Sequence, residues 1–289
     1  MGMSVNPLQR AIGPFRAPIG VLAAVGALLI FVPFIVLVST SWTSSAFLNF
    51  PATGFSLEWY ATVVSSADWI QPFLLSVLVA VIATAGAVIL GVAGALGVSR
   101  VKSAGIARAI RTLFIVPIAL PPVAYAVGLY GINFASDVLH GTMTTLIVGE
   151  VLLALPYVFV IVSGSVSHID PALRPAASTL GARWPVIILR VELPIILSSI
   201  FAGALFAFSV VFDELVLPVF LLPPGVQTLP LRMFSASQES FSPELTAAST
   251  LVSLLALVIL GLGTLLARRR AGAGARRALR RQAAPGEGE

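Results

Sequence analysis

The sequence predicts an all-α integral membrane protein with six transmembrane helices. Of its 289 residues, 58% are hydrophobic and only 10% are charged, and the mean hydropathy is +1.02. Soluble proteins keep themselves dispersed with a surface that is roughly 25–35% charged, so a chain this apolar belongs in a membrane. Apolar stretches of about 20 residues recur along it, which is the length that crosses a bilayer as a helix. Basic residues gather in alternate connecting segments, and this asymmetry orients the spans.

The first span is predicted from Ile19 to Ser39, after a cytoplasmic N-terminal segment at residues 1–18. The apolar run is longer than the ~7–15 residues of a signal-peptide core, which favours an uncleaved span. Residues 42–69 follow and contain three tryptophans but no basic residue. Aromatic residues of this kind sit at the membrane–water interface, so this loop is expected on the outside.

Three spans are predicted in the middle of the chain: Phe73 to Val98, Leu113 to Ile132, and Thr144 to Val166. Many small residues in the first of them favour close contact between helices. The second contains Pro117, Pro121 and Pro122, which predict a distorted helix. The distortion either frees carbonyl groups to line a pathway or gate, or is a packing kink covered by neighbouring helices.

The last two spans are predicted from Ile195 to Val211 and from Leu245 to Ala267, so that residues 19–267 form the transmembrane domain. A cytoplasmic tail at 268–289 carries seven arginines and is expected to anchor the topology and to contact anionic lipid. Sixteen of the seventeen lysines and arginines fall on one predicted side, with Arg232 as the exception. Both termini are therefore predicted to be cytoplasmic.

Several classes of function are excluded by residue counts. The chain has no cysteine, and its two histidines, His140 and His168, are too far apart in the sequence to suggest a metal site. Its single lysine, Lys102, is not preceded by the glycine of a phosphate-binding loop. We therefore expect no cofactor in this chain and no ATPase activity of its own, and any ATP must be bound by a partner subunit. The net charge of +5 follows membrane topology, so nucleic acid is not expected as a partner.

The segment 168–194 is the long polar interruption between the fourth and fifth spans, on the side that carries the arginines. Ala177 and Gly181 are four residues apart and share one face of a helix. Pro175 and Pro185 are typical of a first helical turn, and Gly181 is a natural helix stop. The segment is therefore predicted to hold a short helix with a small-residue face on which another protein docks.

This loop resembles the signature loop of the membrane subunits of binding-protein-dependent ABC importers. Their pattern is E-A-A, a glycine four residues after the second alanine, and then I-x-L-P. The corresponding residues here are Pro175-Ala176-Ala177, Leu180-Gly181-Ala182 and Val191-Glu192-Leu193-Pro194. Pro175 replaces the family's glutamate and Val191 its isoleucine. The substitution at Pro175 removes a carboxylate that could contact the ATPase.

The resemblance implies the transmembrane-domain fold of type I ABC importers and a multi-pass location in a bacterial inner membrane. In that family the loop forms a coupling helix that rests in a groove on an ATPase subunit. The implied partners are an ATPase dimer, a second homologous permease subunit and an extracytoplasmic solute-binding protein. The implied mechanism is alternating access driven by the ATPase.

Five further segments carry a second resemblance: Phe50-Pro51, Gly54 to Tyr60, Phe212-Asp213-Glu214, Thr228-Leu229-Pro230 and Met233-Phe234. They resemble the spermidine/putrescine permease group, and this resemblance implies a polyamine as the expected solute and another small solute as the alternative.

Three acidic residues, with Phe212 beside two of them, are candidates for the substrate pathway. Asp213 and Glu214 end the fifth span, where a cationic solute would neutralise them. Adjacent helical residues face different ways, so at most one need face the pathway. Glu150 lies about 9 Å in from Thr144 and is expected to reach headgroups or water. The alternative for each is a structural acid bonded to neighbouring helices.

Two other classes of protein remain as alternatives. A self-powered secondary transporter needs ionisable groups within its spans, and only Glu150, Asp213 and Glu214 qualify. Transport that survives without a partner ATPase would identify it. An intramembrane hydrolase needs a nucleophile and a base in the membrane, whereas both histidines lie in predicted loops.

Overall fold

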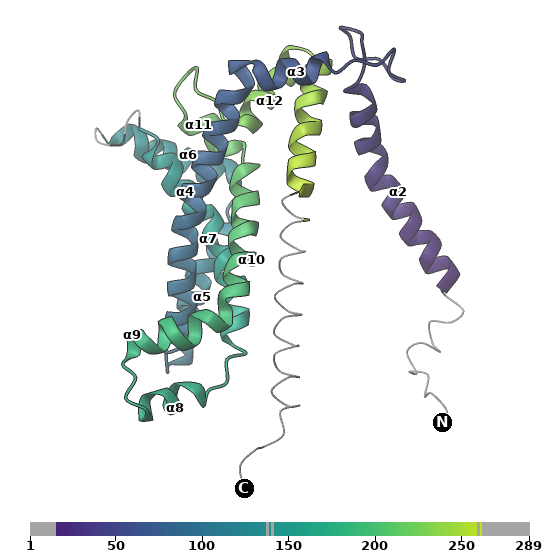
Figure 1. Ribbon diagram of the computed structural model, residues 1–289. Coiled ribbons are helices and arrows are strands. Elements are labelled where there is room, and N and C mark those ends of the chain that lie inside the picture. Colours follow the sequence, from purple (N-terminus) through teal and green to yellow (C-terminus); the bar gives the residue numbers. More distant parts are fainter. Residues whose placement is uncertain (1–15, 137–138, 140–141, 259–260, 262–289) are drawn as a thin grey trace, which may run out of the picture. The chain divides into compact units, whose positions relative to one another are not determined.

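The computed structural model describes residues 16–136, 139, 142–258 and 261, and every regular element among them is helical (Figure 1). The chain separates into two compact units, one of residues 1–66 and 236–256 and one of residues 67–235 and 257–289. Most of the predicted N-terminal segment, His140 and the arginine-rich tail lie outside the described residues.

The smaller unit contains α2 (Arg16–Thr40), α3 (Glu58–Ser65) and most of an apolar helix, Pro243–Val258. The first predicted span is confirmed within α2, and Pro33 lies inside that helix without ending it. The large apolar side chains of α2 are exposed within this chain, as in Leu22 and Ile30. This is expected of a span whose surroundings are lipid rather than its own chain.

The loop between α2 and α3 is fixed by polar contacts. The hydroxyl groups of Ser41 and Tyr60 lie 2.5 Å apart, and the indole N–H of Trp59 donates to the carbonyl of Thr43 at 3.0 Å. The backbone N–H of Ser56 donates to the carbonyl of Trp42 at 2.8 Å. These aromatic residues therefore tie α3 to the end of the first span.

The larger unit is a bundle of α4 (Ala67–Val98), α7 (Thr144–Val166) and α10 (Leu193–Phe212). The fourth predicted span is confirmed at both ends. Helix α4 begins at Ala67 rather than at Phe73, because the polar residues before the apolar run add further helical turns. Helix α10 is continuous with α9 (Trp184–Ile187) and the π-helix η2 (Ile188–Glu192), so the apolar segment begins at Trp184 rather than Ile195.

Small residues bring α4 directly against α7, as the sequence predicted. A Cβ atom at Gly91 would lie 2.9 Å from Val158 Cγ1 and 3.2 Å from the backbone nitrogen of Phe159. A Cβ atom at Gly86 would lie 2.8 Å from Val151 Cγ2. Such contacts are shorter than van der Waals packing allows, so only glycine fits this approach.

The third predicted span is two helices rather than one. Helices α5 (Ala104–Ala119) and α6 (Pro122–Ala135) meet at 100°, with the break at Leu120 and Pro121. The predicted distortion is confirmed, but the element begins at Ala104 and turns sharply, because Pro122 starts a new helix. The hydroxyl of Tyr125 donates to the carbonyl of Gly149 at 2.9 Å and holds α6 on α7.

Four helices of the described residues are long and apolar enough to cross a membrane, and a fifth span results if α5 and α6 count as one. The helix Pro243–Val258 is shorter, and most of the remaining predicted sixth span lies outside the described residues. The count of six spans and the cytoplasmic location of both termini stay predictions. Two short helices, α11 (Val216–Leu221) and α12 (Leu229–Glu239), follow α10.

Candidate functional site

The predicted docking helix is present as α8 (Leu173–Thr179), between α7 and α9. Its start is set by Asp170, whose Oδ1 accepts a hydrogen bond from the backbone N–H of Ala172 at 2.8 Å. Pro175 lies in the first turn, so its missing N–H breaks no helical hydrogen bond. Figure 1 places α8 and α9 together at one end of the bundle of α4, α7 and α10.

Gly181 ends this helix in the manner the sequence predicted. Its φ is +81°, a conformation that glycine adopts without the cost of a side chain. The N–H of Ala182 donates to the carbonyl of Ala177 at 3.1 Å, and the N–H of Gly181 donates to that of Ser178 at 3.0 Å. These two bonds form a Schellman motif. An added Cβ at Gly181 would meet nothing within 4 Å, so the space beside it is open.

The outer face of α8 is formed mostly by small side chains. Pro175 and Ala176 are exposed, and Ala177 and Ala182 are half-buried. The side chain of Leu180 is 88% exposed at the end of the helix. Leu180 is the most exposed large hydrophobic side chain in the described part of the chain, and it lies beside the small residues of this face. Leu193 and Pro194 lie elsewhere, in the first turn of α10.

A buried carboxylate holds the loop to the bundle. The side chain of Glu192 is 0% exposed, and its Oε2 accepts a hydrogen bond from Arg100 Nη2 at 2.5 Å. Its Oε1 accepts a hydrogen bond from Arg174 Nε. Arg174 also donates to Ser99 Oγ at 3.0 Å. We call Glu192, Arg100 and Arg174 the Glu192 cluster.

The cluster pairs one negative charge with two positive charges. Burying an unpaired carboxylate costs several kcal/mol, and this cost is offset here by two arginines. The side chain of Arg100 is 22% exposed and that of Arg174 is 31% exposed. The positive charge that the carboxylate does not neutralise is therefore in contact with solvent. Arg100 also stacks on Trp184, with its guanidinium carbon 5.2 Å from the ring centre.

The sequence did not predict these contacts, although Glu192 stands within the signature loop. A signal was present, because Glu192 is the only acidic residue between Asp170 and Asp213, in a segment that otherwise carries only positive charge. A lone acid in such a segment is expected to pair with a base.

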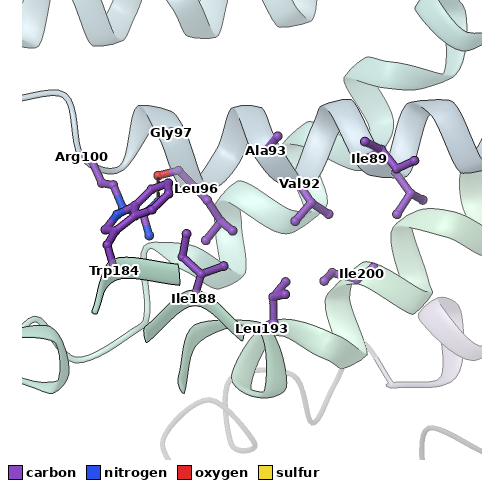
Figure 2. Close-up of a pocket in the computed structure, with 11 residues that line it drawn as sticks. Ile89, Val92, Ala93, Leu96, Gly97, Arg100, Trp184, Ile188, Leu193 and Ile200 are labelled. Atoms are coloured by element: carbon purple, nitrogen blue, oxygen red, sulfur yellow. Dashed lines mark hydrogen bonds between the residues drawn. The ribbon is translucent and has the colours of Figure 1, made fainter. Parts of the chain in front are cut away.

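An apolar groove of about 440 Å³ runs from the cluster between α4 and α9–α10 (Figure 2). Arg100 and Trp184 lie at one end of it, and Ile89 and Ile200 lie at the other. The groove occupies the part of α4 and α10 nearest the cluster, and the two helices pack directly against each other elsewhere.

The acidic pathway candidates lie at the opposite end of α10 from the loop. Asp213 follows the last residue of α10 and is exposed, and its carboxylate has no partner among the described residues. Glu214 is half-buried, and its Oε1 accepts hydrogen bonds from the backbone N–H groups of Val216 at 2.7 Å and Leu217 at 3.2 Å. Phe212 packs edge-on against Phe73, with ring centres 6.2 Å apart. The carboxylate of Asp213 is therefore exposed, whereas that of Glu214 caps the start of α11.

Glu150 does not reach headgroups or water, contrary to the expectation. It is 1% exposed within α7, and its Oε2 has no hydrogen-bond partner among the described residues. The neighbouring Gly149 packs against Leu129 of α6 and Leu217 of α11. These two elements cover the outer part of α7, which distance along the helix could not reveal.

Arg232, the exception to the charge asymmetry, lies over an aromatic ring and beside a pocket. Its guanidinium carbon lies 5.3 Å from the ring centre of Trp69. It lines a polar pocket of about 440 Å³ together with Asp68, Gln71 and Gln227. This local packing accounts for a basic residue on the side predicted to carry few.

A family model described as the binding-protein-dependent transport system inner membrane component matches residues 87–272. The chain belongs to this family. The matched region includes α8, Gly181 and the whole Glu192 cluster.

Two curated relatives are similar over most of their length. The spermidine/putrescine transport system permease protein of Haemophilus influenzae is 29% identical over 83% of this chain and 92% of the relative. The putrescine transport system permease protein of Escherichia coli is 28% identical over 86% of this chain and 89% of the relative.

The fold is also that of a solved importer. A chain of a bacterial ABC transporter that imports the acidic polysaccharide alginate aligns with a TM-score of 0.72 at 16% identity, over 91% of this chain and 99% of that one. The predicted ABC importer transmembrane-domain fold is therefore confirmed. The protein is a permease subunit of an ABC importer in a bacterial inner membrane, with several membrane-spanning helices.

Proposed function

We propose that this permease subunit forms half of the translocation path for a polyamine of the spermidine/putrescine class. Transport is driven by a separate ATPase that docks on the loop 168–194. Docking of the ATPase on this loop is supported by the exposed face of α8, where Leu180 is 88% exposed beside the Gly181 turn.

A cationic solute is supported by Asp213. Its carboxylate is exposed and unpartnered within the described part of the chain, at the point where α10 ends. Polyamines carry several ammonium groups, and each would gain from a carboxylate that is not already neutralised. Both relatives described above are named for polyamine transport, which agrees with this choice.

A partner ATPase is required because the chain lacks a phosphate-binding lysine motif. ATP would be bound by two such subunits, and no cofactor is proposed for this chain. A second homologous permease would supply the other half of the path. An extracytoplasmic solute-binding protein, the partner that the family's description implies, would deliver the solute. Closure of the ATPase dimer would bring two coupling helices together and open the path outward.

The docking step is tested with the complete transporter reconstituted in vesicles. Gly181→Trp places a large side chain in the open space beside α8 and should abolish co-purification of the ATPase or uncouple ATP hydrolysis from uptake. Gly181→Ala measures the backbone effect without a large side chain, since any non-glycine residue at this φ costs roughly 1–2 kcal/mol. Gly105→Trp, at an exposed site at the start of α5, is the matched control. Normal uptake with a normally bound ATPase in Gly181→Trp would refute docking at this loop.

The solute is tested by competition. Uptake of labelled spermidine should be suppressed by excess putrescine and unaffected by an anionic sugar acid. Asp213→Asn should weaken spermidine uptake by raising its KM. Uptake of an anion in place of spermidine would assign another solute while leaving the permease function intact.

A further inference from the structure

The Glu192 cluster joins α8 to α4 and α10, two helices that also pack against each other elsewhere in the larger unit. Arg100 and Ser99 follow the end of α4, Arg174 lies in α8, and Glu192 ends η2 at the start of α10. The carboxylate has no exposure to solvent, so it must remain paired as these elements move.

The cluster lies at the end of the apolar groove. Residues of α4 between Ile89 and Gly97 line one side of this space of about 440 Å³, and residues of η2 and α10 line the other (Figure 2). At the end of the groove, the ion pairs and the stacking of Arg100 on Trp184 connect the two sides. The cluster is thus the polar contact that links α8 and the end of α4 to the start of α10.

The helix containing Glu192 is unusual at this point. Residues Ile188–Glu192 form a π-helix between α9 and α10, and the N–H of Leu193 donates to the carbonyl of Ile188. Single π turns inside α-helices are found frequently at functional sites. Here the π turn brings the acid beside arginines from two other elements.

We propose that the Glu192 cluster is the positioning device that transmits displacement of α8 to α4 and α10. Glu192 fixes the loop to both spans, so a push on α8 moves all three elements as one body. The inference rests on the proposed docking of an ATPase on this loop, but the geometry of the cluster is independent of it.

The presence of two arginines for one buried carboxylate suits this role. If the contact with one arginine is lost, the other arginine still neutralises the buried carboxylate, so the elements stay joined without an uncompensated charge. Arg174 is the more exposed partner and lies in the element that would be displaced.

Coupling is tested in the complete transporter by measuring solute moved per ATP hydrolysed. Glu192→Gln keeps the shape of the side chain and removes its charge. The ATPase should still co-purify and hydrolyse ATP, but solute moved per ATP should fall by roughly tenfold, the change expected when about 1.4 kcal/mol of coupling is lost. Arg174→Gln should reduce the ratio, and Arg174→Lys should partly restore it by keeping the charge. Arg108→Gln is the matched control, since Arg108 is exposed and has no ion pair in the described part of the chain.

Rigidity is tested on this chain by a distance measurement. The chain has no cysteine, so cysteines placed at Ser178 in α8 and Leu197 in α10 can carry spin labels without background. The unmodified cluster should give a narrow distance distribution, Glu192→Gln should broaden it, and Arg108→Gln should not.

The solute moved per ATP and the spin-label distance distribution together test the role of the Glu192 cluster. An unchanged transport ratio in Glu192→Gln, or an unbroadened distribution, would overturn the role of the cluster. If Glu192→Gln does not fold, Arg174→Gln answers the same question, because Arg100 still pairs with the carboxylate. A wild-type chain that binds no ATPase would refute the docking proposal alone, since the distance measurement needs no ATPase.

Discussion

Arg100 Nη2 lies 2.5 Å from Glu192 Oε2, across 92 positions of sequence and with the carboxylate fully buried. This contact places the end of α4 beside the start of α10. Together with Arg174, it also makes the loop that carries α8 part of the helical bundle rather than a free connection.

Replacing both arginines of the Glu192 cluster should destabilise the protein by more than the sum of the single changes. Arg100→Ala or Arg174→Ala alone leaves the carboxylate paired, whereas the double change leaves it buried without a base. Losing all partners of a buried ion is expected to cost on the order of 3–5 kcal/mol. The measurement is the thermal unfolding midpoint in detergent for both single variants and the double variant. Additive effects would show that the two arginines do not share the carboxylate.

Gly91→Ala should lower the unfolding midpoint, because its Cβ would press on Val158 and on the backbone of Phe159. Overpacking of this kind costs typically about 1–3 kcal/mol. Gly97→Ala on the same helix is the control, since a Cβ there meets nothing within 4 Å. Equal midpoints for the two variants would contradict the close contact of α4 with α7.

The two adjacent acids after α10 should give different phenotypes. Glu214→Ala removes the acceptor for the first amides of α11 and should lower stability by about 1 kcal/mol. Asp213→Asn should leave the unfolding midpoint unchanged and raise the KM for spermidine about three- to tenfold. Thermal unfolding and uptake kinetics are measured on the same preparations. A raised KM in Glu214→Ala with none in Asp213→Asn would reverse the assignment.

Leu180→Asp should weaken binding of the ATPase without affecting folding. Leu180 is 88% exposed, so the aspartate enters solvent in the isolated chain but is buried at the proposed interface. Co-purification of the ATPase measures the effect, and helix content by circular dichroism is the folding control. Full retention of the ATPase would show that α8 contacts it elsewhere or not at all.

Much of the architecture followed from local patterns in the sequence. Hydropathy located the span Thr144–Val166 at both ends, because a buried membrane helix is apolar along its whole length. Gly181 was predicted as a helix stop because the left-handed turn requires glycine, and its φ of +81° confirms it. These features depend on residues close together in the chain.

The remaining features depend on contacts between distant segments. The 100° turn between α5 and α6 needs neighbours such as Gly149, which accepts the Tyr125 hydrogen bond. Glu150 is buried because α6 and α11 cover that part of α7. The partners of Glu192 come from α4 and α8, and no local pattern identifies them.

The most direct measurement is spermidine uptake into vesicles that contain this chain with the proposed second permease, with and without the proposed ATPase. Solute-binding protein and labelled spermidine are supplied on one side, and ATP on the other. Uptake should require the ATPase and hydrolysable ATP, and it should fall to background when Leu180→Asp prevents docking. Spermidine uptake that continues without the ATPase would contradict an ATP-driven permease and identify a self-powered transporter.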